Sequence, residues 1–154
     1  MEKLQRHFQD QLDVLSEKVL VMGGCVEETI GNVVSALVGR DSDLARRVIA
    51  DDAKVDRFDL EIDQIGMEIL GLHQPVARDL RFVITAMKIT NDLERIADLC
   101  TNVAERAIEL NAEPQLKPFI DIPLMARRAQ QMVRGALDAF VQRDAAAARA
   151  VIAM

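Results

Sequence analysis

Two acidic ladders are the residues whose types and spacing could do chemistry. In the segment NDLERIADLCTN, Glu94 and Asp98 are four residues apart within an amphipathic helical pattern. Earlier in the chain, a second ladder has spacings of four, three and four residues and consists of Asp52, Asp56, Asp59 and Asp63. Residues at these spacings share one face of a helix, so their like charges repel each other. Each ladder therefore needs protonation, a hydrogen bond or a counter-charge.

The predicted positions of these acids on their helices are unusual. The apolar stripe of the later helix is formed by Val76, Leu80, Val83 and Met87. On a helical wheel Glu94 and Asp98 continue this stripe, and the aspartates flank the apolar stripe of the preceding helix. Carboxylates at such positions must be neutralised or hydrogen-bonded. Arg57 and Arg95 are near in sequence, but helical geometry points both away from the ladders.

Helical bundles often bind metal ions through oxygen ligands on facing helices. We therefore predict a cation site between the two helices, with the ligands Asp52, Asp56, Glu94 and Asp98. An all-oxygen set suits Mg²⁺, Mn²⁺, Ca²⁺ or a ferric cluster more than Zn²⁺. The shell could be completed by Asp59, Asn91, Asn102 and Glu105. About one residue in six is acidic, so pairs at this spacing also arise by chance, and a structural bundle with arginine-paired acids is the alternative.

The composition indicates a helical protein of one domain, or part of a larger protein. Half of the 154 residues are hydrophobic, and the aromatic residues are five Phe with no Trp or Tyr. The formal net charge of −6 argues against a nucleic-acid partner. Cys25 and Cys100 are far apart and suggest neither a disulfide framework nor a zinc site. There is no signal peptide and no run of about 18 apolar residues, so we expect a cytoplasmic protein without a membrane span.

Apolar residues recur every three or four positions and predict long helices. The expected helices cover residues 4–38, 44–72, 76–110 and 122–142, with a fifth starting near residue 144 and continuing to the end of the chain. Gly39 suits a helix end, and Asp41 or Ser42 suits the start of the next helix. Short connections favour antiparallel neighbours, so we predict an all-α protein whose residues 1–112 form a three-helix bundle.

An internal repeat extends this prediction. Shifting the sequence by 103 positions aligns residues 22–51 with residues 125–154 at ten identities in thirty. The alignment spans a helix, its break and the next helix, although two alanine-rich helices can also resemble each other through composition. We therefore expect residues 113–154 to be the start of a second, truncated repeat of the same bundle.

The run PVARDLRFVITAMKITNDLERIAD, from Pro75 to Asp98, closely resembles the signature of the PhoU family of phosphate-specific transport system accessory proteins. The resemblance covers essentially the whole chain and implies two tandem three-helix bundles. It also implies that Asp52 with Asp56, and Glu94 with Asp98, match the family's metal motif, which can hold a multinuclear iron cluster or another metal, Zn²⁺ included. Ala97 stands where the family usually has Gly, which is a change between two small residues.

The function that this resemblance implies is regulation. Proteins of this family act in the cytoplasm, peripherally at the inner membrane, as negative regulators of the phosphate-starvation response and of phosphate homeostasis. They link the ATPase subunit of the phosphate ABC importer to a sensor histidine kinase, and some form homodimers. The alternatives are a metal-dependent hydrolase and a purely structural helical interaction module. We find no Walker motif and no Ser/His/Asp arrangement in the sequence, so we expect no enzyme activity.

Overall fold

The computed structural model describes residues 2–154, with side chains from Arg6 onward. These residues form five helices and no strand: α1 (Glu2–Gly39), α2 (Ser42–His73), α3 (Ala77–Asn111), α4 (Asp121–Gln142) and α5 (Ala145–Ile152). The predicted all-α class is confirmed, and the predicted bounds of the first four helices are met within two residues. The fifth helix ends at Ile152 rather than continuing to the last residue.

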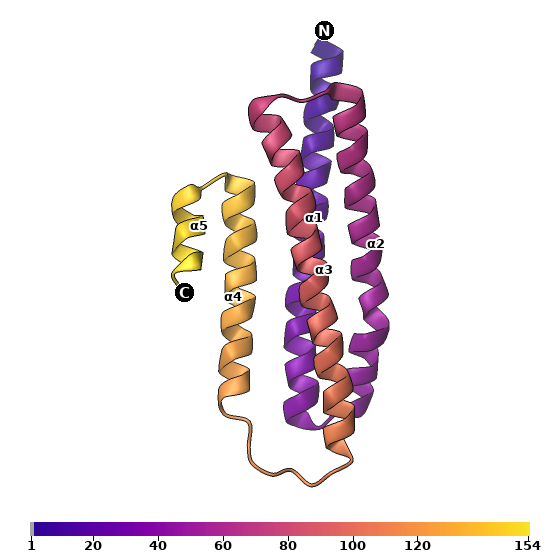
Figure 1. Ribbon diagram of the computed structural model, residues 1–154, viewed down its shortest axis with the longest axis vertical. Coiled ribbons are helices and arrows are strands. Elements are labelled where there is room, and N and C mark those ends of the chain that lie inside the picture. Colours follow the sequence, from indigo (N-terminus) through magenta and orange to yellow (C-terminus); the bar gives the residue numbers. More distant parts are fainter. Residues whose placement is uncertain (1) are drawn as a thin grey trace.

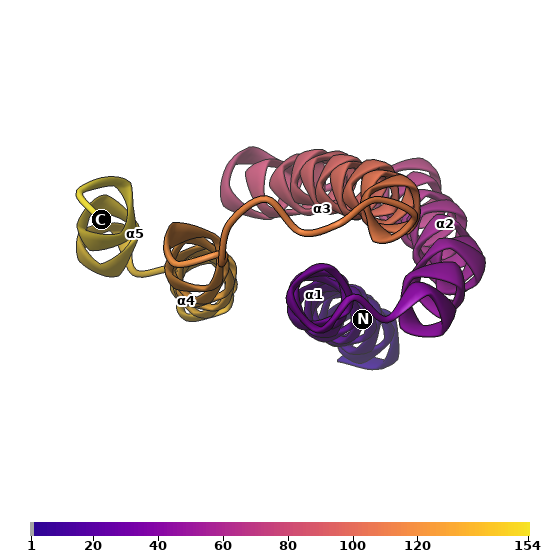
Figure 2. The same ribbon diagram turned by 90° about the horizontal axis from the view of Figure 1, so that it is seen from below.

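The helices form two groups around α1. Figure 1 shows α1, α2 and α3 lying side by side as an antiparallel three-helix bundle, with α4 beside this bundle and α5 outside α4. Seen from below in Figure 2, α4 lies beside α1, which it contacts, and α5 lies on the far side of α4. The described part of α5 contacts α4 alone. The three-helix bundle therefore carries an α4–α5 hairpin on one flank.

The core is built on the apolar stripe of α1. Eight residues of this stripe are buried: Leu12, Leu15, Val19, Met22, Val26, Ile30, Val33 and Leu37. The ninth, Phe8, is partly buried and packs against the core. By length and composition, Arg6–Gly39 is the one helix of the described chain that could cross a membrane. The same test is passed by core helices, and the stripe of α1 is covered by α2, α3 and α4.

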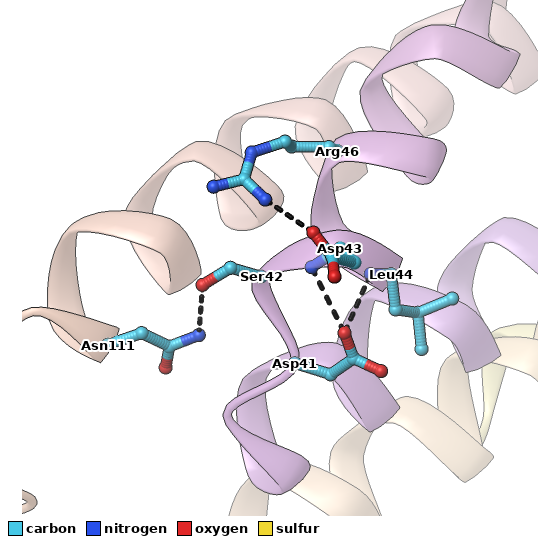
Figure 3. A network of polar contacts seen from close by, with 6 residues as sticks. All are labelled: Asp41, Ser42, Asp43, Leu44, Arg46 and Asn111. Atoms are coloured by element: carbon cyan, nitrogen blue, oxygen red, sulfur yellow. Dashed lines mark hydrogen bonds and ion pairs between the residues drawn. The ribbon is translucent and has the colours of Figure 1, made fainter.

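The α1–α2 connection is held by polar contacts (Figure 3). The Asp41 carboxylate accepts hydrogen bonds from the backbone N–H groups of Asp43 and Leu44 and so caps α2. α1 ends at Gly39, as predicted, and the left-handed residue of the turn is Arg40, with a φ of 54°. The Arg40 guanidinium donates hydrogen bonds to three carbonyl oxygens at and just beyond the end of α3, those of Leu110, Asn111 and Glu113.

The α4–α5 connection has the same local geometry. Arg143 has a φ of 55°, and the Asp144 carboxylate accepts hydrogen bonds from the backbone N–H groups of Ala146 and Ala147. The backbone N–H of Asp144 donates to Ala139 O at 2.9 Å, which is the distance of the equivalent bond in the first turn. The two turns are 103 residues apart and are therefore consistent with the predicted repeat.

The predicted apolar stripe of α3 is wrong over most of its length. Val76 is 76% exposed and Leu80 is 38% exposed, so only Val83 is fully buried and Met87 partly. The buried face of α3 instead consists mainly of small residues: Phe82, Val83, Ala86, Thr90, Leu93, Ala97, Cys100, Ala104 and Ala107. Small side chains let α3 approach α1 and α2 closely, so the size of an apolar residue is a poor guide to its burial here.

Glycine residues on α1 determine how closely α4 approaches. A Cβ atom on Gly23 would overlap the Leu137 side chain, which is itself buried. About two turns further along α1, the Gln130 side chain lies close to Gly31. It donates a hydrogen bond to the Glu27 carbonyl oxygen at 2.8 Å. The α1–α4 contact therefore depends on the absence of a side chain at Gly23.

We predict opposite effects of alanine at two neighbouring glycines of α1. Gly23→Ala should weaken the α1–α4 contact by about 1–3 kcal/mol, because the Leu137 side chain must move. Gly24→Ala meets nothing within 4 Å and should stabilise α1 by up to about 1 kcal/mol through helix propensity. Urea unfolding and amide hydrogen exchange in α4 measure both effects. Equal stability of the two variants would contradict this account of the α1–α4 contact.

Candidate metal centre

The four predicted metal ligands lie on the facing sides of α2 and α3. Asp52 and Glu94 are partly buried, whereas Asp56 and Asp98 are exposed. The prediction that Glu94 and Asp98 continue the buried stripe is therefore wrong: both flank the small-residue face of α3 described above. The prediction that the aspartates of α2 flank its apolar stripe holds, because Val48, Val55 and Ile62 are buried beside them.

The two ladders are close enough to raise each other's proton affinity. The pKa of Asp52 is raised by partial burial first, and then by the charges of Asp56 and Asp98. The pKa of Glu94 is raised by partial burial and by the charges of Asp98, Asp59, Asp56 and Asp52, in that order. Because α2 and α3 are antiparallel, Asp52 lies near Asp98, and Glu94 lies near Asp59. We call this continuous set of five carboxylates the acidic ridge; its members are Asp52, Asp56, Asp59, Glu94 and Asp98.

Basic side chains do not neutralise the acidic ridge. Within the described residues, no Lys or Arg nitrogen lies within 4.0 Å of its carboxylate oxygens. Lys54, between Asp52 and Asp56 in sequence, pairs instead with Asp51 at 2.8 Å. Arg57 and Arg95, which are adjacent to ridge residues in sequence, form no ion pair with any described residue. The alternative considered from the sequence, in which arginines pair with these acids, is therefore not observed among the described residues.

The donor types on the ridge suit a hard cation, but the described side chains do not form a closed cage. The Thr101 hydroxyl is buried without a well-formed hydrogen bond, yet it lies near enough to Asp52 to lower the pKa of that carboxyl, against the larger effect of burial. In the described part of the chain, no three His, Cys, Asp or Glu side chains converge as the ligands of one metal ion. The arrangement can therefore attract a cation with few protein ligands and leave the rest of its shell to water.

Thr101 was not predicted from the sequence, and Asp59 was predicted only as an accessory ligand. The partial burial of Asp59 and its effect on Glu94 place it at the centre of the ridge. The spacing of Asp59 from Asp56 and Asp63 could have indicated this position. The other predicted accessory ligands, Asn91, Asn102 and Glu105, are exposed. Glu105 also lies 3.8 Å from the Arg106 guanidinium. The Thr101 hydroxyl is buried because it lies beside the buried face of α3, and the position of this face was predicted wrongly.

An antiparallel three-helix bundle with surface carboxylates on two facing helices places the protein in the class of helical-bundle proteins. The PhoU domain model matches residues 19–107, which cover most of α1, α2 and α3. Since the match spans more than half of the chain, the protein belongs to the PhoU family.

Relatives with known names support this assignment. The chain is 37% identical over 137 residues to the phosphate-specific transport system accessory protein PhoU homolog 2 of Thermotoga maritima, covering 89% of this chain and 58% of that protein. It is 33% identical to the accessory protein PhoU of Escherichia coli K12, covering 57% of that protein. The chain therefore spans somewhat more than half the length of these relatives.

Solved structures agree with the fold. The crystal structure of PhoU from Pseudomonas aeruginosa superposes with a TM-score of 0.88 at 37% identity, covering 93% of this chain and 69% of that one. The phosphate transport system regulatory protein PhoU from Streptococcus pneumoniae gives a TM-score of 0.84 at 26% identity, covering 94% of this chain and 68% of that one. The helical bundle and its α4–α5 hairpin thus follow the architecture of known members.

We predict that mild acidification stabilises the metal-free protein through the ridge. A carboxyl whose pKa is raised in the folded state binds its proton more tightly there than in the unfolded chain. Its unfavourable contribution is fully present above the raised pKa, and it is relieved as the pH falls towards 3.8, the usual value for Asp. As the pH falls from 7 to about 4, protonation of these groups should therefore increase the free energy of unfolding measured in the presence of a chelator.

The double variant Asp52→Asn, Glu94→Gln tests this prediction. It should lose this part of the pH dependence and be more stable at pH 7, by about 0.2–0.5 kcal/mol for each like-charge contact removed. Urea unfolding at the two pH values measures both quantities. The control Asp10→Asn, Glu17→Gln changes the same charge on the exposed face of α1 and should keep the pH dependence. A double variant that is less stable than the wild type at pH 7 would contradict the repulsion.

Proposed function

We propose that this protein regulates phosphate uptake and the phosphate-starvation response. It would act in the cytoplasm, peripherally at the inner membrane, as an adaptor between the ATPase subunit of the phosphate ABC importer and a sensor histidine kinase. Its effect on the starvation response would be negative, and its assembly state a homodimer. The observation that carries this proposal is the PhoU domain match over residues 19–107.

The names of the relatives support the coarser part of this proposal. The Thermotoga and Escherichia proteins are called accessory proteins of phosphate-specific transport, and the Streptococcus protein is called a regulatory protein of that system. The chain covers 58% and 57% of the first two proteins, so the partners of the longer proteins are transferred to it as a proposal only. The metal-dependent hydrolase gains no specific support, because no described pocket contains Asp52, Asp56, Glu94 or Asp98.

We also propose that the acidic ridge binds a metal cation with a structural or regulatory role. The support is the accumulation of five carboxylates without a basic partner, together with the buried hydroxyl of Thr101. A bound cation would supply the missing positive charge, and Asp52, Asp56, Glu94 and Asp98 would hold it. By neutralising both ladders, it would fix the spacing of α2 and α3.

Metal removal should lower the melting temperature. At a free metal concentration of about 100 times Kd, binding stabilises the folded state by about 2.7 kcal/mol. For a chain of this length, that corresponds to a melting temperature about 5–10 °C higher with Fe³⁺ or Mn²⁺ than with a chelator. The variant Glu94→Gln, Asp98→Asn should show no such difference, and Asp10→Asn, Glu17→Gln should retain it. Identical melts of the wild type with and without chelator, and no metal by elemental analysis, would remove the site.

The adaptor role is tested by capture of its partners. The immobilised chain should retain the purified ATPase subunit of the importer and the cytoplasmic part of the kinase from the same organism. Both proteins should be recovered in a stoichiometric ratio, as judged by quantitative gel analysis. A full-length PhoU protein of that organism provides the reference. Capture of neither partner by either protein would contradict the proposed function, and capture by the longer protein alone would assign the contact to residues outside this chain.

A further inference from the structure

A pocket between α3 and the α4–α5 hairpin has no role in the proposed function. Its volume is about 450 Å³, which is within the range of small-molecule sites. Its walls are the first four turns of α3, the last turns of α4 and the start of α5. Over the described residues, the backbones of α3 and α4 do not come within 8 Å of each other, so side chains alone bridge them. The acidic ridge contributes no residue to this pocket.

Three arginines from two different helices line this pocket. Arg78 and Arg81 come from α3, and Arg143 comes from the left-handed end of α4. None of the three forms an ion pair or a side-chain hydrogen bond with another described residue. The one carboxylate in the lining, Asp144, already accepts two backbone hydrogen bonds as the cap of α5. In a protein with a formal net charge of −6, this pocket is a local site of positive charge.

The floor of the pocket is apolar and aromatic. The rings of Phe82 and Phe140 stack at 4.8 Å between centroids with an angle of 7° between their planes. The Arg143 guanidinium lies over the Phe82 ring, 4.7 Å from its centre, and so places a positive charge directly on this floor. The rest of the lining is mostly short apolar residues and Ile89: Ala136, Ala139, Ala145 and Ala148. An apolar floor next to several guanidinium groups is suited to a ligand that has a flat ring and an anionic group.

We propose that this pocket binds a nucleoside phosphate. Guanidinium groups pair with phosphate oxygens through two parallel hydrogen bonds, and three of them offer a net positive charge that a monocarboxylate would leave largely uncompensated. The base would lie on the apolar lining beside the stacked phenylalanines, and the phosphates would lie against Arg78, Arg81 and Arg143. The proposal concerns binding and not hydrolysis, and it is independent of the regulatory function proposed above.

Binding at this position would connect the three-helix bundle to the hairpin. The phosphates would bridge residues of α3 and the end of α4, which otherwise meet here through the stacked Phe82 and Phe140. A ligand that contacts both helices binds only the folded arrangement, so it should stabilise the hairpin against local opening. Hydrogen exchange in α4 therefore gives a second readout besides affinity.

Isothermal titration of the full chain with ADP, ATP, adenosine and inorganic phosphate tests the proposal. ADP and ATP should bind to one site for each chain, and adenosine and phosphate alone should each bind at least about tenfold more weakly, because each lacks one half of the recognition. Hydrogen exchange in α4 should slow when ADP is bound. The binding should weaken as the salt concentration rises, since charged groups carry the phosphate contact.

A matched pair of variants assigns the binding to the pocket. Arg78→Gln, Arg81→Gln should weaken ADP binding at least about tenfold, and Arg143→Lys should weaken it less because it keeps the charge. The control Arg47→Gln, Arg57→Gln removes the same charge from exposed positions of α2 outside the pocket and should bind ADP as the wild type does. Circular dichroism melts establish that each variant is folded.

Three results would overturn the proposal. The first is no saturable binding of ADP or ATP to the wild-type chain. The second is an equal loss of affinity in the pocket variant and the control variant, which would indicate attraction by net charge alone. The third is inorganic phosphate binding as tightly as ADP, because the aromatic floor would then contribute nothing to recognition.

Discussion

The arrangement of the whole molecule depends on the apolar stripe of α1. This helix has 38 residues and is therefore about 57 Å long, and its stripe is buried from Leu12 to Leu37. Because α2 and α3 cover one side of α1 and α4 covers another, α1 is the one described helix that contacts three others. Burial of each large stripe residue contributes about 1.5–3 kcal/mol, so the register of the neighbouring helices is strongly determined.

The packing of α2 and α3 on α1 keeps the carboxylates of the acidic ridge close together although their charges repel each other. The close approach of α2 and α3 requires small residues, and the buried face of α3 supplies Ala86, Ala97, Ala104 and Ala107. Like charges on exposed helix faces cost only a few tenths of a kcal/mol per pair, which is small beside the burial of side chains such as Ile62 and Leu93. The core can therefore maintain a row of unneutralised carboxylates, whereas Asp51 and Glu109 on adjacent faces have basic partners.

Much of this architecture could be predicted from local signals. The stripe of α1, the Asp41 cap and the helix bounds depend on periodicity and on hydrogen bonds within one turn, so the sequence predicts them directly. The facing of the two ladders follows from short antiparallel connections. The buried face of α3 was misplaced because Val76 and Leu80 lie at the end of the bundle, where fewer neighbours cover them. The hydrogen bonds from Arg40 to the end of α3 were missed because their acceptors are seventy residues away in sequence.

Residue size at helix contacts also explains why a pocket forms where it does. On α1, Gly23 and Gly31 let α4 approach closely, and the side chains of Leu137 and Gln130 fill the space. On the first turns of α3, the residues that face α4 are large, and the stacked Phe82 and Phe140 separate the two backbones. A helix that is close to one neighbour and held away from the next must leave space between them. The pocket between α3 and α4 is therefore a consequence of how α4 is seated on α1, and its arginines are brought together by tertiary packing that no local pattern in the sequence specifies.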